Sequence, residues 1–544
     1  RIPERAYLSF ATATLPKVKD NGSVNFNIYV RADGQKEKIF SETIKRETPL
    51  FYSRQVSQEK VLAESLTRWH EYRVDLTSYE GKEVEISFVS DSEDNTFAIW
   101  GDPVVLSERK ETQYNVILVS IDTLRADHMG SYGYPRNTSP NMDAIARDGT
   151  LFLNAISQAS WTFPSHASFM TSQYPSALGI NLETELNTPS NKLPSGVETL
   201  AEVFRRHGYL TTGVVGGGYL SKEFGWSRGF SSYNEKWTAE LENAYQEAED
   251  WIFKHRKDKF FLFFHTYEVH DYLPGENDLY AYQLDQQDEL KQLIALYDGN
   301  IKNVDGFMGQ LVNTLKGLNL DKKTLIIITS DHGEEFLEHG YLYHENSLYD
   351  ELLKVPLIFY MPGTVPENLI VESQVRLIDI MPTIVDILGM SLNNTLEGKT
   401  LKFFFKGKTE ERLAFSESVR CCVSLVNIFP TSLRMNKYKY IKYLEGRDRL
   451  KMLEKKKSGW PMWVKDVYDK KPVHELYDLS KNPKELLGEN LSNSSLAKEL
   501  SEKIEDFKKE NALKWKYVKS KDSSAKTTLS EEITNELKAL GYLQ

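Results

Sequence analysis

The chain has 544 residues, which allows two to four domains, and its 40% apolar and 12% aromatic content is ordinary for a globular protein with a good core. Its net charge of −11 argues against nucleic acid or an anionic membrane surface as the main partner. No apolar run reaches the ~18–20 residues that cross a bilayer, so we expect no transmembrane segment. The two cysteines, Cys421 and Cys422, are adjacent and say little about the redox compartment.

The first residue of the chain is Arg1 rather than Met. We therefore expect that the natural start, with a signal peptide or an anchor, has been removed. This favours a periplasmic or extracellular location and leaves a cytoplasmic one open. The sequence does not indicate the oligomeric state.

Residues 1–110 predict an antiparallel β-sandwich of short strands. Apolar and polar residues alternate in Val24–Val30, Tyr72–Leu76 and Val84–Val89, with Gly, Asn and Asp turns between them. The stretch 69–103 resembles jelly-roll accessory modules found beside carbohydrate-active enzymes. Of the two roles such a module can have, we favour a structural one over sugar binding.

From Asn115 the chain alternates buried strands with helices. Val116–Ile121 is a continuous apolar run, as in a strand that is buried on both faces. Ser139 followed by Pro140 predicts a helix start, and Ser195 with Glu198 predicts a capping box. Further strands are expected at Leu151–Leu153, Leu210–Val215, Phe260–Phe264, Leu325–Thr329 and Leu357–Tyr360, with helices near 238–257, 287–317 and 379–388.

This alternation predicts an α/β sandwich with a largely parallel sheet over residues 111–400. From about residue 401 to 544 the sequence is Lys-rich and irregular, with a strand-like run at Tyr438–Tyr443 and a charged helix near 494–510. We expect a small C-terminal α+β subdomain there.

Three of the buried strands run directly into ionisable residues. Asp122 follows the first strand, and His265 follows Phe260–Phe264, with His270 just beyond it. Asp331 and His332 follow Leu325–Thr329. Because ligands of open α/β sheets gather beyond the carboxyl ends of the strands, we expect these side chains to lie together.

A fourth feature is the stretch Ala159–His166, between a strand-like run and a helix. Thr162 stands two residues ahead of Pro164, at the expected helix start. Unpaired N–H groups and the helix dipole at such a position favour an anion such as phosphate or sulfate. An ordinary capped helix start would have the same residue types.

Asp122, Asp331 and His332 offer two carboxylates and an imidazole, which suit one divalent metal ion. The Thr162 hydroxyl could complete the set and become a nucleophile when a metal lowers its pKa. An imidazole ligand favours Mn²⁺ or Zn²⁺ over Ca²⁺. We expect the remaining polar residues to hold the anion, support the nucleophile or protonate the leaving group: His166, His270 and His344 as catalytic groups, and Arg125, His265 and His339 as substrate ligands.

Ordered motifs from about residue 112 onwards resemble the sulfatase branch of the alkaline phosphatase superfamily. The motifs are Ile121–Arg125, Thr138–Asp143, Met170–Pro175, Ser330–Glu334, Lys354–Leu357, Glu475–Leu479 and Leu540–Leu543. The resemblance implies an α/β/α sandwich and a metal-dependent hydrolase.

The departures from that family affect the chemistry. Sulfatases carry a Cys or Ser in a C/S-x-P-S-R motif that is oxidised to formylglycine, whereas this chain has Thr162, Pro164, Ser165 and His166. The extra methyl group of threonine prevents formation of the aldehyde, and the family's later Lys corresponds to His344. A threonine nucleophile with an Asp-His metal pair instead resembles the superfamily's phosphodiesterases and its phosphoglycerol and phosphoethanolamine transferases.

We therefore expect a metal-dependent phosphodiesterase or phosphomonoesterase that acts on a small-molecule, glycan or lipid-headgroup ester. The alternatives are a sulfatase that works without formylglycine, a phospho-group transferase and a non-catalytic binding protein. The loops 216–237 and 266–286 are expected to line the substrate pocket, and they contribute the aromatic residues Tyr219, Trp226, Trp237, Tyr267 and Tyr272.

Overall fold

The computed structural model describes residues 1–15, 23–45, 70–92, 97–107, 114–180, 192–235, 241–271, 288–344, 347–393, 395–418, 430–443, 474–486 and 494–521. The chain divides into two compact units. The first comprises Arg1–Thr112 together with Gly208–Leu210 and Lys257–Lys259, and the second comprises the rest of the chain. The two cysteines and the tail Leu540–Leu543 lie outside the described residues.

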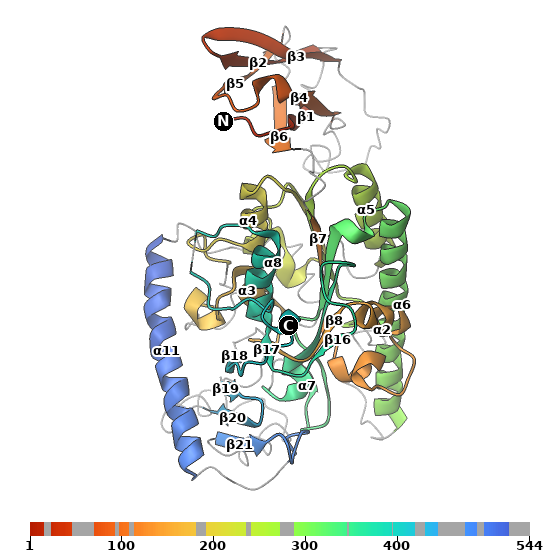
Figure 1. Cartoon of the computed structure of the whole chain (residues 1–544), viewed down its shortest axis with the longest axis vertical. Helices are drawn as coiled ribbons and strands as arrows, with labels where there is room; N and C mark the ends of the chain where they lie inside the picture. Colours follow the sequence, from red (N-terminus) through yellow and green to blue (C-terminus); the bar gives the residue numbers. More distant parts are fainter. Residues whose placement is uncertain are drawn as a thin grey trace, which may run out of the picture. The chain divides into compact units, whose positions relative to one another are not determined.

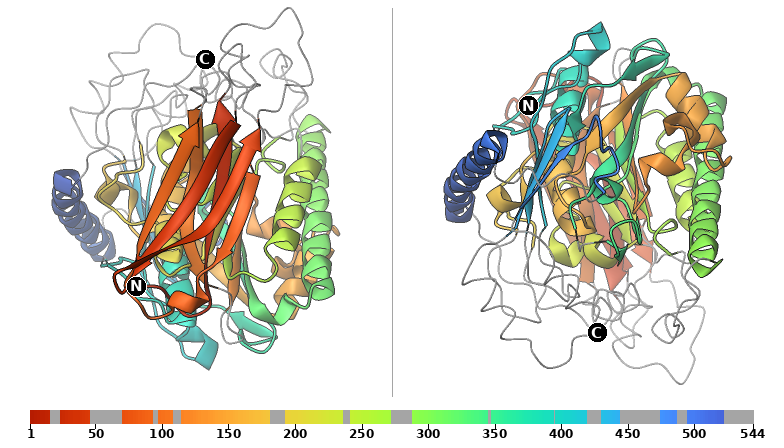
Figure 2. Two further views of the ribbon diagram at one scale, coloured as in Figure 1. Left: turned by 90° about the horizontal axis from the view of Figure 1, so that it is seen from above. Right: turned by 90° about the horizontal axis from the view of Figure 1, so that it is seen from below.

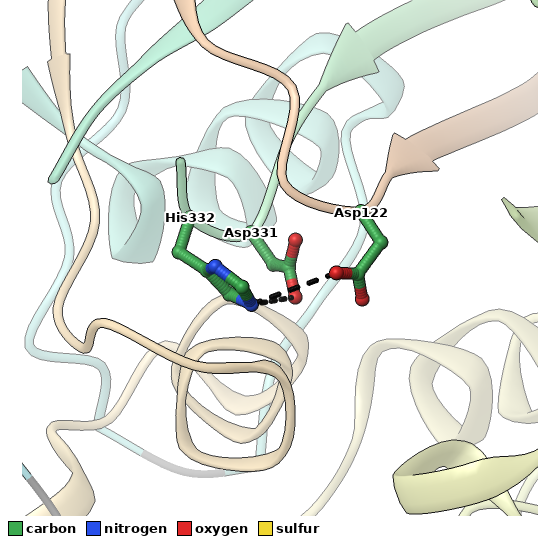
Figure 3. Close-up of side chains that lie close together, drawn as sticks. All are labelled: Asp122, Asp331 and His332. Carbon is green, nitrogen blue, oxygen red and sulfur yellow. Dashed lines mark ion pairs between the residues drawn. The ribbon is translucent and has the colours of Figure 1, made fainter. Parts of the chain in front are cut away.

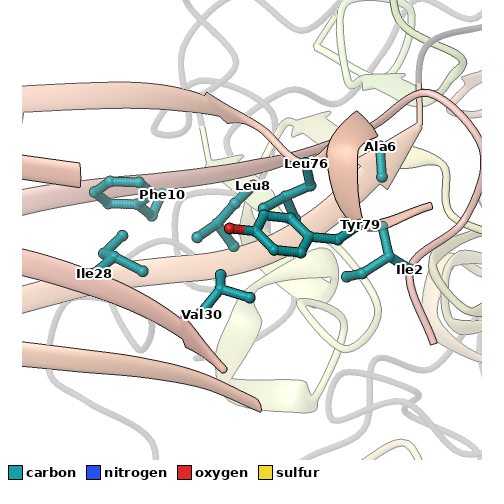
Figure 4. Close-up of a cluster of buried hydrophobic side chains, with 8 residues drawn as sticks. All are labelled: Ile2, Ala6, Leu8, Phe10, Ile28, Val30, Leu76 and Tyr79. Atoms are coloured by element: carbon teal, nitrogen blue, oxygen red, sulfur yellow. The ribbon is translucent and has the colours of Figure 1, made fainter. Parts of the chain in front are cut away.

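The first unit contains two antiparallel three-stranded sheets. One has the order β4 (His70–Asp75), β1 (Ala6–Leu15), β6 (Phe97–Ser107), and the other has β3 (Gln35–Lys45), β2 (Ser23–Ala32), β5 (Glu85–Ser92). Leu8 and Phe10 of β1 pack with Ile28 and Val30 of β2 between the two sheets (Figure 4). The alternating pattern therefore forms a sandwich, with its apolar side chains facing inward.

A nine-stranded sheet forms the centre of the second unit. Its order is β10 (Ser232–Glu235), β9 (Leu210–Val215), β11 (Phe260–Thr266), β7 (Asn115–Ile121), β12 (Thr324–Thr329), β15 (Lys354–Tyr360), β8 (Thr150–Ile156) and β16 (Leu369–Val371), with β17 (Val375–Arg376) also paired to β8. Strands β7, β9, β11 and β12 are buried along their whole length, as their continuous apolar runs predict. Strand β15 runs antiparallel to both of its neighbours, β12 and β8. The predicted largely parallel α/β sandwich is confirmed.

Helices cover both faces of this sheet (Figure 1). On one side lie α2 (Pro140–Arg147), α5 (Leu241–Lys254) and α6 (Asp288–Gly317), and on the other lie α3 (Thr162–Thr171), α4 (Leu200–Arg206) and α8 (Ile380–Leu388). The predicted start of α2 is confirmed, with Ser139 as N-cap and Pro140 as first helical residue. None of the helices within the described ranges is both long and apolar enough to span a membrane.

The predicted capping box at Ser195 and Glu198 was wrong by four residues. Helix α4 begins at Leu200, and Thr199 is its N-cap. The Thr199 hydroxyl accepts a hydrogen bond from the backbone N–H of Glu202 at 3.2 Å, and the Glu202 carboxylate accepts one from the N–H of Thr199 at 2.8 Å. The two Ser/Thr-x-x-Glu patterns follow each other directly in sequence, and the second one, Thr199–Glu202, forms the cap. Glu198 is instead paired with Arg206.

The C-terminal part forms a four-stranded antiparallel sheet and a long helix. The strands are β18 (Ala414–Glu417), β19 (Thr431–Arg434), β20 (Tyr438–Lys442) and β21 (His474–Asp478), and the helix is α11 (Ser495–Lys521). Leu500 and Ile504 of α11 pack against Leu433 and Tyr440 of the sheet. Figure 2 shows α11 beside these strands, on the flank opposite to α6.

A candidate metal centre and active site

The register of the central sheet brings the predicted site residues to one edge. Thr329 of β12 is paired with Ser120 of β7, so Asp331 and Asp122 each follow two residues beyond the same rung. His265 of β11 is also paired with Ser120. Three neighbouring parallel strands therefore deliver their polar residues side by side, as the sequence predicted.

Asp122, Asp331 and His332 form a compact buried cluster (Figure 3), which we call the metal cluster. One ligand atom from each residue lies within 4.8 Å of those of the other two. The Nε2 atom of His332 is 3.3 Å from Asp331 Oδ2 and 3.6 Å from Asp122 Oδ1. Among the described residues, neither of these two oxygens accepts a hydrogen bond. Buried carboxylate oxygens without donors are costly, and a bound cation would satisfy them.

The electrostatics of the metal cluster also fit a cation. Burial raises the pKa of Asp122 to about 6, and burial together with the charge of Asp122 raises the pKa of Asp331. His332 Nδ1 lies 2.9 Å from the carbonyl oxygen of Gly333, so this nitrogen carries the proton and Nε2 presents its lone pair. Two carboxylates and one oriented imidazole are a ligand set for one divalent ion.

Thr162 is the first residue of α3 and is fully buried. Its hydroxyl donates to Asp122 Oδ2 at 3.2 Å and lies 3.5 Å from His332 Nε2. The threonine hydroxyl therefore contacts two of the three residues of the metal cluster. The helix start singled out in the sequence lies at the sheet edge, where the dipole of α3 favours an anionic group.

His166 lies one turn further along α3 and holds this helix start against β7. Its Nδ1 is 2.8 Å from the carbonyl oxygen of Thr162 and 3.4 Å from Asp331 Oδ2, and its Nε2 is 3.0 Å from Ser120 Oγ. Burial lowers the pKa of His166 to about 3, so the ring is neutral at physiological pH. These contacts fit the predicted role of supporting the nucleophile.

Three more predicted histidines lie around the metal cluster. His265 Nε2 is 3.2 Å from Asp122 Oδ2, and the His344 ring centroid is 4.6 Å from that of His332. The His270 ring centroid is 5.2 Å from that of His344. Burial lowers the pKa of His265 and of His344 to about 4, and it also lowers that of His270. These lowered pKa values leave the three rings neutral at physiological pH.

The structure does not bring Arg125 or His339 into the same cluster. The Arg125 guanidinium binds Asp127 at 2.8 Å, Glu338 at 2.6 Å and the carbonyl oxygen of Glu334 at 2.9 Å. His339 Nδ1 lies 2.8 Å from Glu351 Oε1. These contacts engage both side chains with other protein groups.

Glu334 is a site residue that was missed in the sequence. It is buried, its Oε2 lies 3.2 Å from His344 Nδ1, and burial raises its pKa to about 8. Its position within the Ser330–Glu334 motif was the available signal. Of the aromatic residues named for the pocket loops, Tyr219, Trp226 and Tyr267 are buried, and Trp237 and Tyr272 lie outside the described residues. Trp226 packs on Phe163 and Tyr219 packs on Trp161.

The α/β sandwich carries a buried cluster of carboxylates and an imidazole at the carboxyl edge of its sheet, which is where open α/β sheets bind their ligands. The sequence model of the sulfatase family matches residues 114–390, which are half of the chain. A second family model, for the C-terminal part of N-sulphoglucosamine sulphohydrolase, matches residues 337–474. The chain therefore belongs to the sulfatase family, whose members generally bind a divalent metal.

Individual relatives agree with this assignment. Bovine arylsulfatase K is 30% identical over 250 residues, which cover 42% of this chain and 41% of that protein. An ulvan-active sulfatase of Formosa agariphila is 23% identical and covers 72% of this chain and 78% of its own length. The chain thus matches well under two thirds of the length of the arylsulfatase.

Solved structures show the same fold. A 2-O GAG sulfatase superposes with a TM-score of 0.57 and 19% identity, covering 77% of this chain and 96% of that protein. A phosphonate monoester hydrolase of Agrobacterium radiobacter superposes with a TM-score of 0.56 and 20% identity, covering 73% and 96%. The fold is therefore the one shared by these proteins, in agreement with the family to which the chain belongs.

Proposed function

We propose that the enzyme hydrolyses phosphate esters, with Thr162 as its nucleophile. The observation that carries the proposal is the position of the Thr162 hydroxyl, 3.2 Å from Asp122 Oδ2 and 3.5 Å from His332 Nε2. A formylglycine sulfatase needs a Cys or Ser at this place, and a threonine cannot be oxidised to the aldehyde. A plain hydroxyl can form a phosphate ester that water resolves in a second step.

The metal cluster would hold one Mn²⁺ or Zn²⁺ ion in preference to Ca²⁺, because one of its three ligand groups is an imidazole. Such an ion would lower the pKa of the Thr162 hydroxyl and neutralise a non-bridging oxygen of the substrate. We expect one equivalent of metal per chain. Elemental analysis of the purified enzyme measures this, and two equivalents of zinc would contradict it.

The chain's own groups account for the remaining steps. Thr162 Oγ attacks the phosphorus, so that a new O–P bond forms while the bond to the leaving alcohol breaks. His344 or His270 supplies a proton to the leaving oxygen, and water then attacks the phospho-threonine. His166 keeps the first turn of α3 in place through the carbonyl oxygen of Thr162.

The charges around the site favour an ester group with a single negative charge. Among the described residues, Asp122, Asp331 and His332 form no hydrogen bond or ion pair with a Lys or Arg side chain. Two carboxylates balance one divalent ion, so little positive charge is left for a dianion. Phosphodiesters therefore suit the site better than phosphomonoesters. The alcohol part would come from a small molecule, a glycan or a lipid headgroup.

The test is the ratio of kcat/KM for matched aryl phosphodiester, phosphomonoester and sulfate esters on the metal-loaded enzyme. We expect the diester to react fastest. The monoester is disfavoured by its second negative charge. The sulfate ester also carries a single charge, but it is disfavoured because Thr162 cannot form formylglycine. Sulfate ester hydrolysis without formylglycine is the second candidate, because the family and the relatives named above are mostly sulfatases. A preference for the sulfate ester by tenfold or more, about 1.4 kcal/mol in transition-state stabilisation, would establish it and refute the phosphoesterase proposal.

A phospho-group transferase is the remaining alternative. Its phospho-threonine would be resolved by an acceptor alcohol in place of water. Adding glycerol or ethanolamine to the phosphodiester assay separates the two. Hydrolysis predicts release of phosphorylated product into water at an unchanged rate, whereas transfer predicts a phosphorylated acceptor and a higher turnover.

A further inference from the structure

Glu334 and His344 lie opposite each other at the base of a short hairpin. The hairpin pairs β13 (Glu335–Phe336) with β14 (Leu342–Tyr343), and its antiparallel register sets Glu335 opposite Tyr343 and Phe336 opposite Leu342. One step further along this register, Glu334 stands opposite His344. Directly opposed side chains lie on the same face of a hairpin, within contact distance. The 3.2 Å separation of Glu334 Oε2 and His344 Nδ1 follows from this pairing.

The base of the hairpin is tightly fixed to its surroundings. Arg125 donates to the carbonyl oxygen of Glu334 at 2.9 Å and to the Glu338 carboxylate at 2.6 Å. A Cβ atom on Gly333 would lie 1.9 Å from the carbonyl oxygen of Glu351, so only glycine fits there. Glu334 therefore has a fixed backbone position next to the metal ligand His332.

The contact with Glu334 decides which nitrogen of His344 can act on the ester. Because Nδ1 lies 3.2 Å from Glu334 Oε2, the Nε2 atom is the ring nitrogen directed away from this carboxyl group. The ring centroid lies 4.6 Å from that of His332, so this contact fixes how His344 faces the metal cluster. Without Glu334 the ring could adopt either tautomer and could rotate about its side-chain bonds.

We propose that Glu334 is a positioning residue, which orients His344 so that Nε2 donates a proton to the leaving-group oxygen. This inference rests on the role of His344 in the proposed function. Carboxylates that orient a metal-bound histidine from behind typically contribute 10- to 100-fold, and we expect a similar effect on His344.

The experiment is a double-mutant cycle of Glu334→Ala and His344→Ala, with kcat and KM measured for two phosphodiesters. One has a p-nitrophenyl leaving group, which needs little protonation, and the other has an alkyl leaving group. We expect Glu334→Ala to lower kcat for the alkyl ester by about 10- to 100-fold and for the nitrophenyl ester by less than about threefold. The double variant should be no slower than His344→Ala alone.

Two further variants separate positioning from folding. Glu334→Gln keeps a side chain of the same length whose amide N–H can donate to His344 Nδ1, so it should restore most of the alkyl-ester rate. Glu335→Gln is the matched control, because Glu335 is the adjacent buried carboxylate and accepts from Ser347 Oγ at 2.7 Å. We expect this control to lower both rates equally or not at all.

Additive losses in the cycle, or equal losses for the two leaving groups in Glu334→Ala and Glu334→Gln, would overturn the inference. A His344→Ala variant with full alkyl-ester activity would remove the proposed role of His344 and the inference with it. The choice between phosphate and sulfate would be unaffected, because it is read from the wild-type substrate ratios.

Discussion

Two clusters of buried acidic side chains lie within the second unit, and they differ in how their charges are balanced. In the metal cluster, Asp122 and Asp331 face each other and one imidazole. In the second cluster, which we call the ion network, Lys439 binds Asp350 and Glu485, each at 2.8 Å, and Arg434 binds Asp350 at 2.8 Å. Both clusters are buried.

The two clusters show what distinguishes a ligand site from a structural one. Burial alone would raise the pKa of Asp350, but Arg434 and Lys439 hold it well below its usual range. The pKa of Asp122 is instead raised to about 6, because burial is not offset by a Lys or Arg. In the ion network Asp350 has two cationic partners, whereas Asp122 and Asp331 have no Lys or Arg partner among the described residues.

The largest effect is expected at Thr162, the proposed nucleophile. Thr162→Ala should lower kcat/KM by roughly 10³-fold or more, because it removes the hydroxyl that would form the covalent ester. Thr162→Ser should keep much of the activity unless a maturation enzyme oxidises the new serine. Thr171→Ala, at the other end of α3, is the control. Within the described part of the chain, its hydroxyl bonds only to the carbonyl oxygen of Ala167 in the same helix, and activity should be unchanged. Substantial turnover by Thr162→Ala would show that the nucleophile lies elsewhere.

Removing a charge from the ion network should affect folding and not chemistry. Lys439→Met leaves Asp350 with one partner fewer and Glu485 without its cation, so the free energy of unfolding should fall by about 3–5 kcal/mol. Denaturant unfolding measures this, and elemental analysis should show unchanged metal content. Lys437→Met is the matched control two residues away, because its ammonium is half exposed and 3.9 Å from Asp478. If Lys439→Met lost its metal, the two clusters would not be independent.

Much of the fold and of the metal cluster could be predicted from sequence because both depend on local patterns. Val116–Ile121 and Leu325–Thr329 are apolar throughout, and parallel strands of this kind end at a common edge. Asp122, Asp331 and His332 come just after those two runs. Parallel strands end at the same edge of a sheet, so this position in the sequence was enough to predict that the three side chains lie together.

The hairpin after β12 could not be predicted, because its strands have two residues each and show no periodicity. His339 and His344 are five residues apart in sequence, and only the register of this hairpin decides which of them is near the metal cluster. Arg125 was predicted as a substrate ligand because its ion-pair partner within the protein could not be recognised from the sequence. Its partner Glu338 is more than two hundred residues away and carries no signal in the sequence.

A third buried carboxylate tests whether a raised pKa alone marks a ligand site. Glu417, at the end of β18, accepts a hydrogen bond from the N–H of Ser176 at 3.0 Å, and burial raises its pKa to about 7. The folded state thus binds a proton more tightly than the unfolded state, whose pKa is about 4.5. The stability that follows is fully present below about pH 4.5 and is lost as the pH rises through 7.

Glu417→Gln should therefore gain stability relative to the wild type as the pH is raised from 5 to 8. The difference between the two pKa values limits this gain to about 3 kcal/mol. Denaturant unfolding of both proteins at the two pH values measures it, and metal content and kcat should be the same in both. A constant difference in stability across this range would contradict the pKa, and lost metal would place Glu417 with the ligand site.

The smallest effect is expected at His339, which the sequence suggested as a substrate ligand. Its Nδ1 pairs with Glu351 at 2.8 Å, its Nε2 lies 3.1 Å from the carbonyl oxygen of Glu485, and its ring stacks on Tyr349 at a centroid distance of 3.6 Å. These contacts tie His339 to the edge of the ion network. His339→Gln retains one polar contact, so we expect a loss of stability of about 1 kcal/mol and a change of less than about threefold in kcat/KM. His344→Gln provides the comparison, with an expected loss of about 100-fold for an alkyl phosphodiester. A KM that rises tenfold in His339→Gln at constant kcat would restore His339 as a substrate ligand, since a residue that only supports the hairpin would not alter binding alone.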